Sequence, residues 1–106
     1  MVNTRAKGSR IRLKCIKELE ANGYLVGIVE RTGKFIKIKD LFGLFDLCAI
    51  GYGQVRFIQV TCNKPHPHKP YTDFSDKYVA SNPSIVVEQH VWYDKGKEKG
   101  WKKWLY

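Results

Sequence analysis

The sequence predicts an α/β fold in which a mixed β-sheet is flanked by an N-terminal helix and a short second helix. Three segments carry this prediction. Residues 4–21 have helical spacing of apolar residues, residues 44–62 form two strand-like runs around a Gly-Tyr-Gly turn, and residues 84–106 contain two further strand-like runs. A chain of this length holds one core. We therefore expect a single domain over residues 1–106.

The first element is a helix from Thr4, a suitable N-cap, to Ala21, followed by Asn22-Gly23 as a C-terminal stop. Its apolar face consists of Ile11, Cys15, Ile16 and Leu19. Arg12 falls inside the arc of this face. Its guanidinium therefore either extends to the edge of the core or projects into a polar site on the sheet.

The segment after this helix alternates and is rich in β-branched residues over 24–30, which predicts a strand. Residues 31–41 form a basic connection with room for a short strand at 35–38. Four prolines interrupt the pattern over 63–83, where residues 72–80 have the composition of a short helix.

The central hairpin carries the most informative polar residues. With Gly51 to Gln54 as its loop, Ile50 pairs with Val55, and the same register places Asp46 opposite Gln59 on one sheet face. Burying such groups costs a few kcal/mol unless a partner satisfies them. The pair therefore indicates a metal, a ligand or a special hydrogen-bond partner, and the alternative is that Asp46 caps a neighbouring turn or loop.

The last two strands are predicted at 84–93 and 101–106, joined by a charged turn. Alternation in the first of them defines a face that we expect to be buried, formed by Ile85, Val87, Gln89, Val91 and Tyr93. The opposite face, with Glu88, His90 and Trp92, is then exposed. This makes Trp92 the candidate platform for a stacked base or a dimer contact.

A formal net charge of +9 predicts a polyanionic partner, with nucleic acid foremost, because lysine and arginine neutralise phosphates and release counterions. The alternative is that the basic residues only keep the protein soluble, but their clustering argues against it. The residues predicted to contact nucleic acid are Arg5, Lys7, Arg10, Arg12, Arg31, Lys34, Lys37, Lys39, Lys64 and Lys69.

The three cysteines lie in patterned segments and are expected to be reduced core residues. No apolar run is long enough to span a membrane, and the basic N-terminus lacks the apolar stretch of a signal peptide. We therefore expect a cytoplasmic protein without a membrane partner.

A zinc site is a further alternative, with Cys62, His66 and His68 as ligands. Their spacing matches no recognised ligand pair, and an extended loop is the simpler interpretation. His66 and His68 are then candidates for phosphate contacts, or part of a solvated polar loop.

Several short motifs together resemble the PD-(D/E)XK nuclease superfamily, particularly archaeal-type Holliday-junction resolvases. These motifs are Lys7-Gly8, Asn22-Gly23-Tyr24, Phe45-Asp46-Leu47 and Ile58-Gln59-Val60-Thr61, and the resemblance runs from about residue 7 to residue 62. It implies a restriction-endonuclease-like core, DNA as substrate, a homodimer, and Mg²⁺ or Mn²⁺ held by an Asp on one hairpin strand and a Glu-x-Lys on the next, with a further Glu on the first helix.

The chain departs from this family pattern at three positions. Asp46 matches the metal-binding Asp, whereas Gln59 occupies the second carboxylate position and Thr61 the catalytic lysine position. Arg12 falls close to the helical Glu. The resemblance thus implies Asp46, Gln59 and Thr61 as catalytic residues and Asp46, Gln59 and the Val60 carbonyl as metal ligands. Thr61 cannot replace a lysine, while Arg12 favours a phosphate over a cation.

Two interpretations follow. In the first, the protein is a divalent-metal-dependent DNA endonuclease for junctions or branched DNA, and a carboxylate such as Glu30 or Asp40 completes the metal site. In the second, it is a catalytically inactive DNA- or RNA-binding module or a dimeric interaction protein, in which Arg12 and Asp46 form a structural ion pair.

Overall fold

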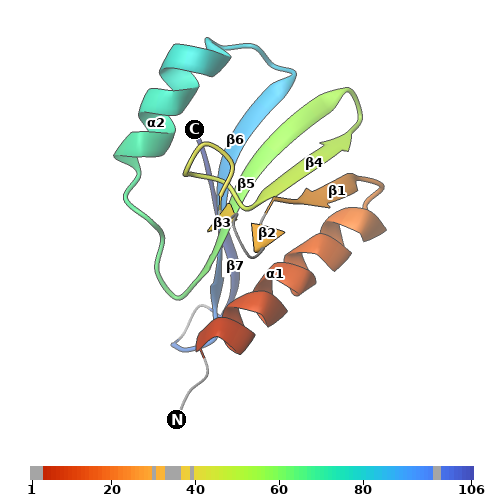
Figure 1. Cartoon of the computed structure of the whole chain (residues 1–106), viewed down its shortest axis with the longest axis vertical. Helices are drawn as coiled ribbons and strands as arrows, with labels where there is room; N and C mark the ends of the chain where they lie inside the picture. The colour runs from red at the N-terminus through yellow and green to blue at the C-terminus, as the bar shows by residue number, and fades with distance from the viewer. Residues whose placement is uncertain (1–3, 30, 33–36, 39, 97–98) are drawn as a thin grey trace.

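The computed structural model describes residues 4–29, 31–32, 37–38, 40–96 and 99–106. Five strands form one sheet in the order β1-β4-β5-β6-β7, and β2 and β3 form a separate two-stranded sheet. Figure 1 shows α1 running diagonally across the strands and α2 standing apart from it near the upper end of β6. The predicted mixed α/β architecture is confirmed.

The N-terminal helix α1 spans Thr4–Ala21, as predicted. Two residues beyond its end lies Gly23, whose φ of +92° is accessible to glycine at little cost. A side chain there would also meet the hydroxyl group of Tyr52, 2.6 Å from the position of a Cβ atom. The chain then enters β1 (Leu25–Ile28), which is shorter than the predicted strand.

The central hairpin consists of β4 (Leu47–Gly51) and β5 (Gln54–Cys62). Its predicted register is confirmed, since Ile50 pairs with Val55 and Gly51 pairs with Gln54. Tyr52 and Gly53 form the two-residue turn and both have positive φ, 52° and 74°. This turn geometry matches the twist of antiparallel strands and fixes the register from Gly51–Gln54 to Leu47–Ile58.

The chain segment that connects β1 to β4 contains a small separate sheet. In it, β2 (Arg31–Thr32) pairs with β3 (Lys37–Ile38). The strand expected at 35–38 is thus present at its last two residues. Its first two residues lie outside the part of the chain that the structure describes.

The second helix starts earlier than predicted. α2 spans Lys69–Phe74 and continues as a π-helical turn, η1 (Ser75–Val79). Pro70 does not interrupt α2 because it lies in the first turn, where its missing N–H would have no partner. The crossover through α2 allows β6 (Ile85–Tyr93) to pair in parallel with β5, and β7 (Gly100–Leu105) then pairs antiparallel with β6.

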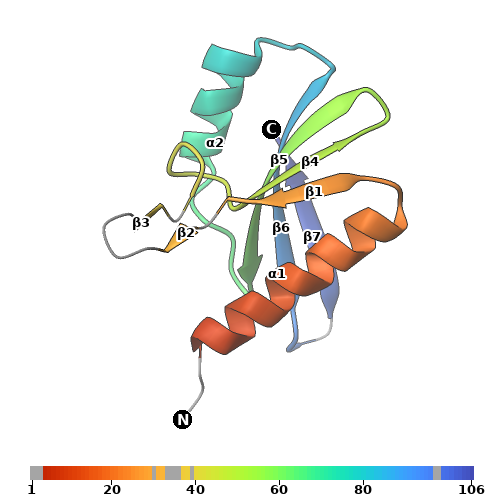
Figure 2. The same ribbon diagram turned by 45° about the vertical axis from the view of Figure 1, so that its right-hand side comes forward.

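Helices cover both faces of the sheet, as the turned view in Figure 2 also illustrates. The core on the α1 face includes Ile11, Cys15, Leu47, Ile58 and Val60. The core on the α2 face includes Phe45, Tyr71, Val79 and Val87. The described part of the chain has no helix long and apolar enough to cross a membrane.

The prediction of an exposed face on β6 is wrong. Glu88 and His90 are each only 2% exposed, while Val87 and Val91 on the opposite face are fully buried. β6 is an inner strand between β5 and β7, and α1 covers its Glu88 side. Alternation in the sequence identified the two faces correctly but not the helix that covers the polar one.

Candidate functional site

Asp46 lies immediately before β4, where the hairpin register changes. Its amide donates to the carbonyl oxygen of Ile58 at 3.1 Å, although Ile58 is the pairing partner of Leu47. Two successive residues thus share one partner, which is the pattern of a β-bulge. The ladder stops one residue before the predicted pairing of Asp46 with Gln59. Instead, the Asp46 carboxylate accepts the N–H of Val60 at 3.1 Å.

The environment of Asp46 disfavours its negative charge. Burial, with a smaller contribution from the nearby Asp40 carboxylate, outweighs the lowering effects of the Val60 N–H and the Arg12 guanidinium, and the net effect raises the pKa of Asp46 to about 7. The side chain is only 7% exposed. A cation bound beside these two carboxylates would relieve their repulsion.

Gln59 and Thr61 project from the same face of β5 and contribute two unused oxygen atoms. The Gln59 amide donates through Nε2 to Nε2 of His66 at 3.2 Å. Its carbonyl oxygen and the Thr61 hydroxyl are buried and have no hydrogen-bond partner among the residues that the structure describes. Unpaired buried oxygens are costly, so they point to a ligand at this site.

Gln89 holds the loop after β5 against this site. It lies next to Gln59 in the parallel β5–β6 register. Its side chain accepts the N–H of His66 at 2.9 Å and donates to the carbonyl oxygen of the same residue at 3.1 Å. It also donates to the Tyr106 hydroxyl at 2.8 Å. The sequence had placed Gln89 on a buried face without assigning it this role.

The donor set suits a hard divalent cation. Carboxylate, amide carbonyl, hydroxyl and main-chain carbonyl oxygens are the ligands that Mg²⁺ and Mn²⁺ take, and Mg²⁺ often uses only one or two protein carboxylates. Asp46, Asp40, Gln59, Thr61 and the Val60 carbonyl carry such atoms. Among the described residues, however, no contact joins Asp46, which lies near Arg12 and Cys15 of α1, to Gln59 or Thr61, which alternate with the α1-face residues Ile58 and Val60. Among the described residues no group of three or more His, Cys, Asp or Glu is placed to hold a metal, so the candidate site relies on neutral oxygens.

The zinc alternative is not supported. Within the described ranges Cys62, His66 and His68 do not converge into a metal-binding group. His66 contacts Gln59, and Nδ1 of His68 contacts the Tyr106 hydroxyl at 2.5 Å. The loop is therefore held by hydrogen bonds to β5, β6 and the C-terminus.

The predicted nucleic-acid contacts are only partly described. Arg10, Lys64 and Lys69 are exposed, and Arg12 is half-buried beside Asp46. Lys69 pairs with Asp73 at 2.8 Å, an exposed contact of little energetic weight. The side chains of the remaining predicted contacts lie outside the described structure, namely Arg5, Lys7, Arg31, Lys34, Lys37 and Lys39.

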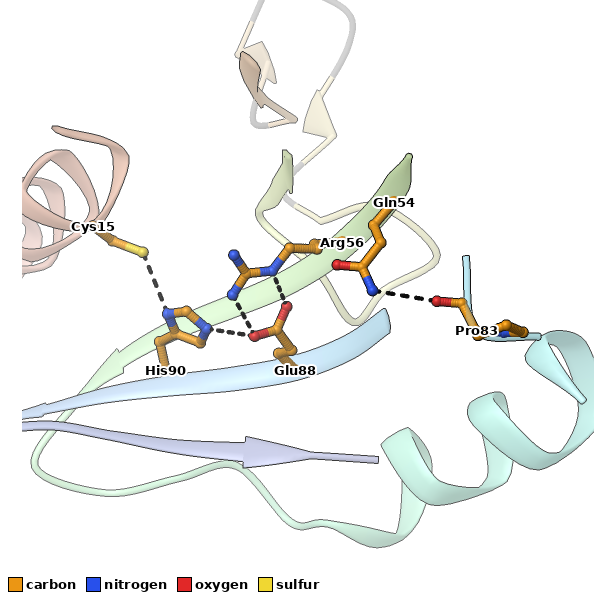
Figure 3. A network of polar contacts seen from close by, with 6 residues as sticks. All are labelled: Cys15, Gln54, Arg56, Pro83, Glu88 and His90. Atoms are coloured by element: carbon orange, nitrogen blue, oxygen red, sulfur yellow. Dashed lines mark hydrogen bonds and ion pairs between the residues drawn. The ribbon is translucent and has the colours of Figure 1, made fainter. Parts of the chain in front are cut away.

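A second polar network lies beneath α1 and was not foreseen from the sequence (Figure 3). Arg56 donates two hydrogen bonds to Glu88, at 2.6 and 2.7 Å, and His90 contacts Glu88 at 3.0 Å. Burial alone would raise the pKa of Glu88, but the hydrogen bonds from Arg56 and His90 outweigh it and lower the pKa to about 2. Glu88 is thus an ionised carboxylate in the core.

Cys15 ends this network, with its Sγ 3.6 Å from Nδ1 of His90. Burial raises the pKa of the Cys15 thiol to about 12. The thiol therefore stays protonated at neutral pH and donates to His90, whose other ring nitrogen donates to Glu88. Because a thiol is a weak nucleophile, we assign this network a structural role.

The three cysteines carry free thiols, which agrees with the expectation of reduced cysteines. Cys15 is buried in the core, and Cys48 and Cys62 are half-buried on β4 and β5. Cys15 lies close enough to Asp46 that, after burial, the Asp46 charge is the next cause that raises the pKa of its thiol.

No protein-family model and no curated protein matches the chain. Among solved structures, a Holliday junction resolvase from the archaeal hyperthermophile Archaeoglobus fulgidus is similar, with a TM-score of 0.58 and 14% sequence identity. The similarity covers 92% of this chain and 76% of the resolvase. At this identity it establishes the fold alone. The chain therefore has a restriction-endonuclease-like α/β fold, similar to the fold of this resolvase.

Proposed function

We propose that the protein binds DNA and that the site around Asp46 is a divalent-metal-dependent endonuclease centre for junctions or branched DNA. The resolvase-like fold and the net charge of +9 support this proposal. The observation that carries it is the pair of unpaired buried oxygens on β5, Gln59 Oε1 and Thr61 Oγ1, on the strand whose Val60 amide binds the Asp46 carboxylate.

Asp46, Gln59 and the Val60 carbonyl would hold the metal, with Asp40 adding negative charge. A bound Mg²⁺ or Mn²⁺ supplies Lewis-acid polarisation of the phosphodiester and lowers the pKa of a coordinated water. Arg12 can bind a substrate phosphate, because a guanidinium forms paired hydrogen bonds with phosphate oxygens. The Thr61 hydroxyl can orient a water or a phosphate by hydrogen bonding, but it supplies no positive charge.

A second candidate function is binding of nucleic acid without cleavage. It is favoured by the position of Arg12, which stabilises the Asp46 carboxylate as a bound metal would, and by the use of that carboxylate as an acceptor for the Val60 amide. In this case the domain binds DNA or RNA, or acts as a dimeric interaction protein, and the former metal site only stabilises the fold.

A calorimetric titration with Mn²⁺ separates the two candidates. If the endonuclease proposal is correct, the wild type binds Mn²⁺ and Asp46→Asn does not, while Asp73→Asn, a control at an exposed carboxylate, binds as the wild type does. Cleavage of a four-way junction in Mn²⁺ should then be lost in Asp46→Asn alone. Absence of Mn²⁺ binding by the wild type, with junction binding retained, would favour the non-catalytic candidate.

We also propose that the protein acts as a homodimer, because a resolvase-like enzyme acts on two strands. Sedimentation equilibrium measures this directly. A monomer at concentrations at which the protein binds junction DNA would contradict it.

A further inference from the structure

Trp104 occupies an unusual position at the open edge of the sheet. It lies on β7, the edge strand, beside Gln89 of β6. His68, which precedes α2, approaches its ring with centroids 5.4 Å apart, and the ammonium group of Lys102 lies 5.1 Å from its centroid. Trp104 is half-buried, whereas His68 and Lys102 are exposed.

The other two tryptophans have structural roles. Trp92 and Trp101 pack edge to face, 5.3 Å apart, against the core beneath α1. Lys14 of α1 covers the Trp92 ring at 4.4 Å, and the indole nitrogen of Trp101 is buried. The expectation that Trp92 is the exposed platform is therefore not supported, and Trp104 takes its place as the candidate.

We propose that Trp104, His68 and Lys102 form a binding site for an unpaired nucleotide, with the base stacked on Trp104 and the adjacent phosphate held by Lys102. The inference rests on the nucleic-acid binding proposed above. It adds a preference for single-stranded segments. Single-strand sites in proteins combine these same elements, an aromatic platform and cations that follow the backbone.

The energies allow a base to replace Lys102 on the ring. An exposed cation–π contact contributes about 0.5–1 kcal/mol, whereas a base stacked on an aromatic side chain contributes about 1–3 kcal/mol. Lys102 has a long exposed side chain and can move from the indole to a phosphate without leaving the site. Asp73, the acidic group on α2, is paired with Lys69, and Lys102 forms no salt bridge with a residue that the structure describes.

Hydrogen bonds connect this site to the proposed metal centre. The Tyr106 hydroxyl bridges His68 and Gln89, and Gln89 holds the main chain of His66, which contacts Gln59. Gln59 and Trp104 therefore lie on β5 and β7, with Gln89 of β6 between them. A single strand bound at Trp104 can continue toward Gln59, so an unpaired arm of a nucleic acid can reach both sites at once.

The test compares binding of a twelve-nucleotide oligothymidine and of a hairpin duplex by fluorescence anisotropy at one salt concentration. Trp104→Leu should weaken oligothymidine binding about 5- to 150-fold, the range for one lost stacking contact, and leave duplex binding unchanged. Trp104→Phe should recover part of the affinity. Tyr78→Leu, which removes an exposed aromatic ring of η1, is the matched control and should bind both ligands as the wild type does.

Lys102→Gln tests the site without removing the indole. It should weaken oligothymidine binding and lower the slope of log affinity against log salt by about 0.7, the value for one single-strand phosphate. Unchanged oligothymidine binding in Trp104→Leu, or equal losses for both ligands, would overturn the proposal, as would a wild type that does not bind oligothymidine.

The outcomes also separate this site from the proposed nuclease. If oligothymidine binding depends on Trp104 but the wild type binds no Mn²⁺, the stacking site stands and the endonuclease proposal fails. If the wild type binds Mn²⁺ and duplex but not oligothymidine, the endonuclease proposal stands and the stacking site fails.

Discussion

Single residues decide what this fold can do at its candidate site. Asp46 is a carboxylate in a place that disfavours charge, and Gln59 and Thr61 supply oxygens without charge. Glu88 has the opposite environment, since two cationic or hydrogen-bonding partners keep it ionised in the core. Two carboxyl groups of this fold therefore differ in charge preference, since the environment of Asp46 disfavours the anion and that of Glu88 favours it.

The first prediction concerns the pH dependence of stability. Because the folded state raises the pKa of Asp46 from 3.8 to about 7, the folded protein holds this proton more tightly than the unfolded chain. The stabilisation that this proton gives to the folded state is fully present below pH 4 and is lost as pH rises through 7. The loss lowers the free energy of unfolding by on the order of 4 kcal/mol at most. Asp46→Asn retains an acceptor for the Val60 N–H and should remove this loss.

Urea unfolding at pH 5 and pH 8 measures the effect. The free energy of unfolding of Asp46→Asn, relative to the wild type, should rise between the two pH values, whereas that of Asp73→Asn should not. A parallel pH dependence in all three proteins would show that Asp46 is an ordinary exposed carboxylate.

The second prediction concerns the buried ion pair. Arg56→Met leaves Glu88 without its guanidinium partner and should cost roughly 3–5 kcal/mol of stability. Adding Glu88→Gln removes the unpaired charge and should restore much of the loss. A double-mutant cycle by thermal unfolding measures the coupling, and additive effects would contradict a direct interaction.

At the level of elements, turns and helix ends follow local rules. The β4–β5 turn needs positive φ at Gly53, and α1 needs a residue beyond its end that accepts a left-handed conformation. The loop after β5 is held by a distant residue instead, because the side chain of Gln89 binds its main chain at His66. Local sequence fixes the turns, and a residue from another strand holds this loop.

A pair of glycine substitutions tests the turn geometry. Gly53→Ala should destabilise the protein by about 1–2 kcal/mol, because an L-residue at positive φ brings Cβ close to the following carbonyl oxygen. Gly8→Ala, in α1 with no atom within 4 Å of the added Cβ, should instead stabilise by up to about 1 kcal/mol. Chemical denaturation measures both, and changes of equal sign would contradict the assigned backbone conformations.

At the scale of the whole molecule, excess positive charge bears on the proposed binding of nucleic acid. A net charge of +9 on 106 residues predicts affinity for nucleic acid that depends on phosphate contacts rather than on base sequence. The exposed Lys64, on the loop that Gln89 anchors, is placed to contribute to this surface.

Salt titrations of junction and duplex binding test this expectation. Six or more phosphate contacts would lower the affinity at least about a thousandfold between 50 and 200 mM salt. Lys64→Gln should weaken binding equally for unrelated sequences and reduce the salt slope by about one. A slope unchanged by this substitution would remove Lys64 from the binding surface.

The sequence by itself determined the elements whose signals are local. The bounds of α1 follow from apolar residues at helical spacing and a Gly after the last turn, and the β4–β5 register follows from a two-residue turn. The family resemblance carried by the motifs around Asp46 and Gln59 also predicted the restriction-endonuclease-like fold, which the structure confirms.

Only the tertiary structure decided how these elements serve a site. Parallel pairing of β5 with β6 places Gln89 beside Gln59, the bulge at Asp46 turns its carboxylate to the Val60 amide, and α1 covers Glu88 and His90. The periodicity of the sequence predicts none of these contacts, because each contact joins two different elements. Periodicity reports which face of an element is apolar, whereas packing decides which partner that face meets.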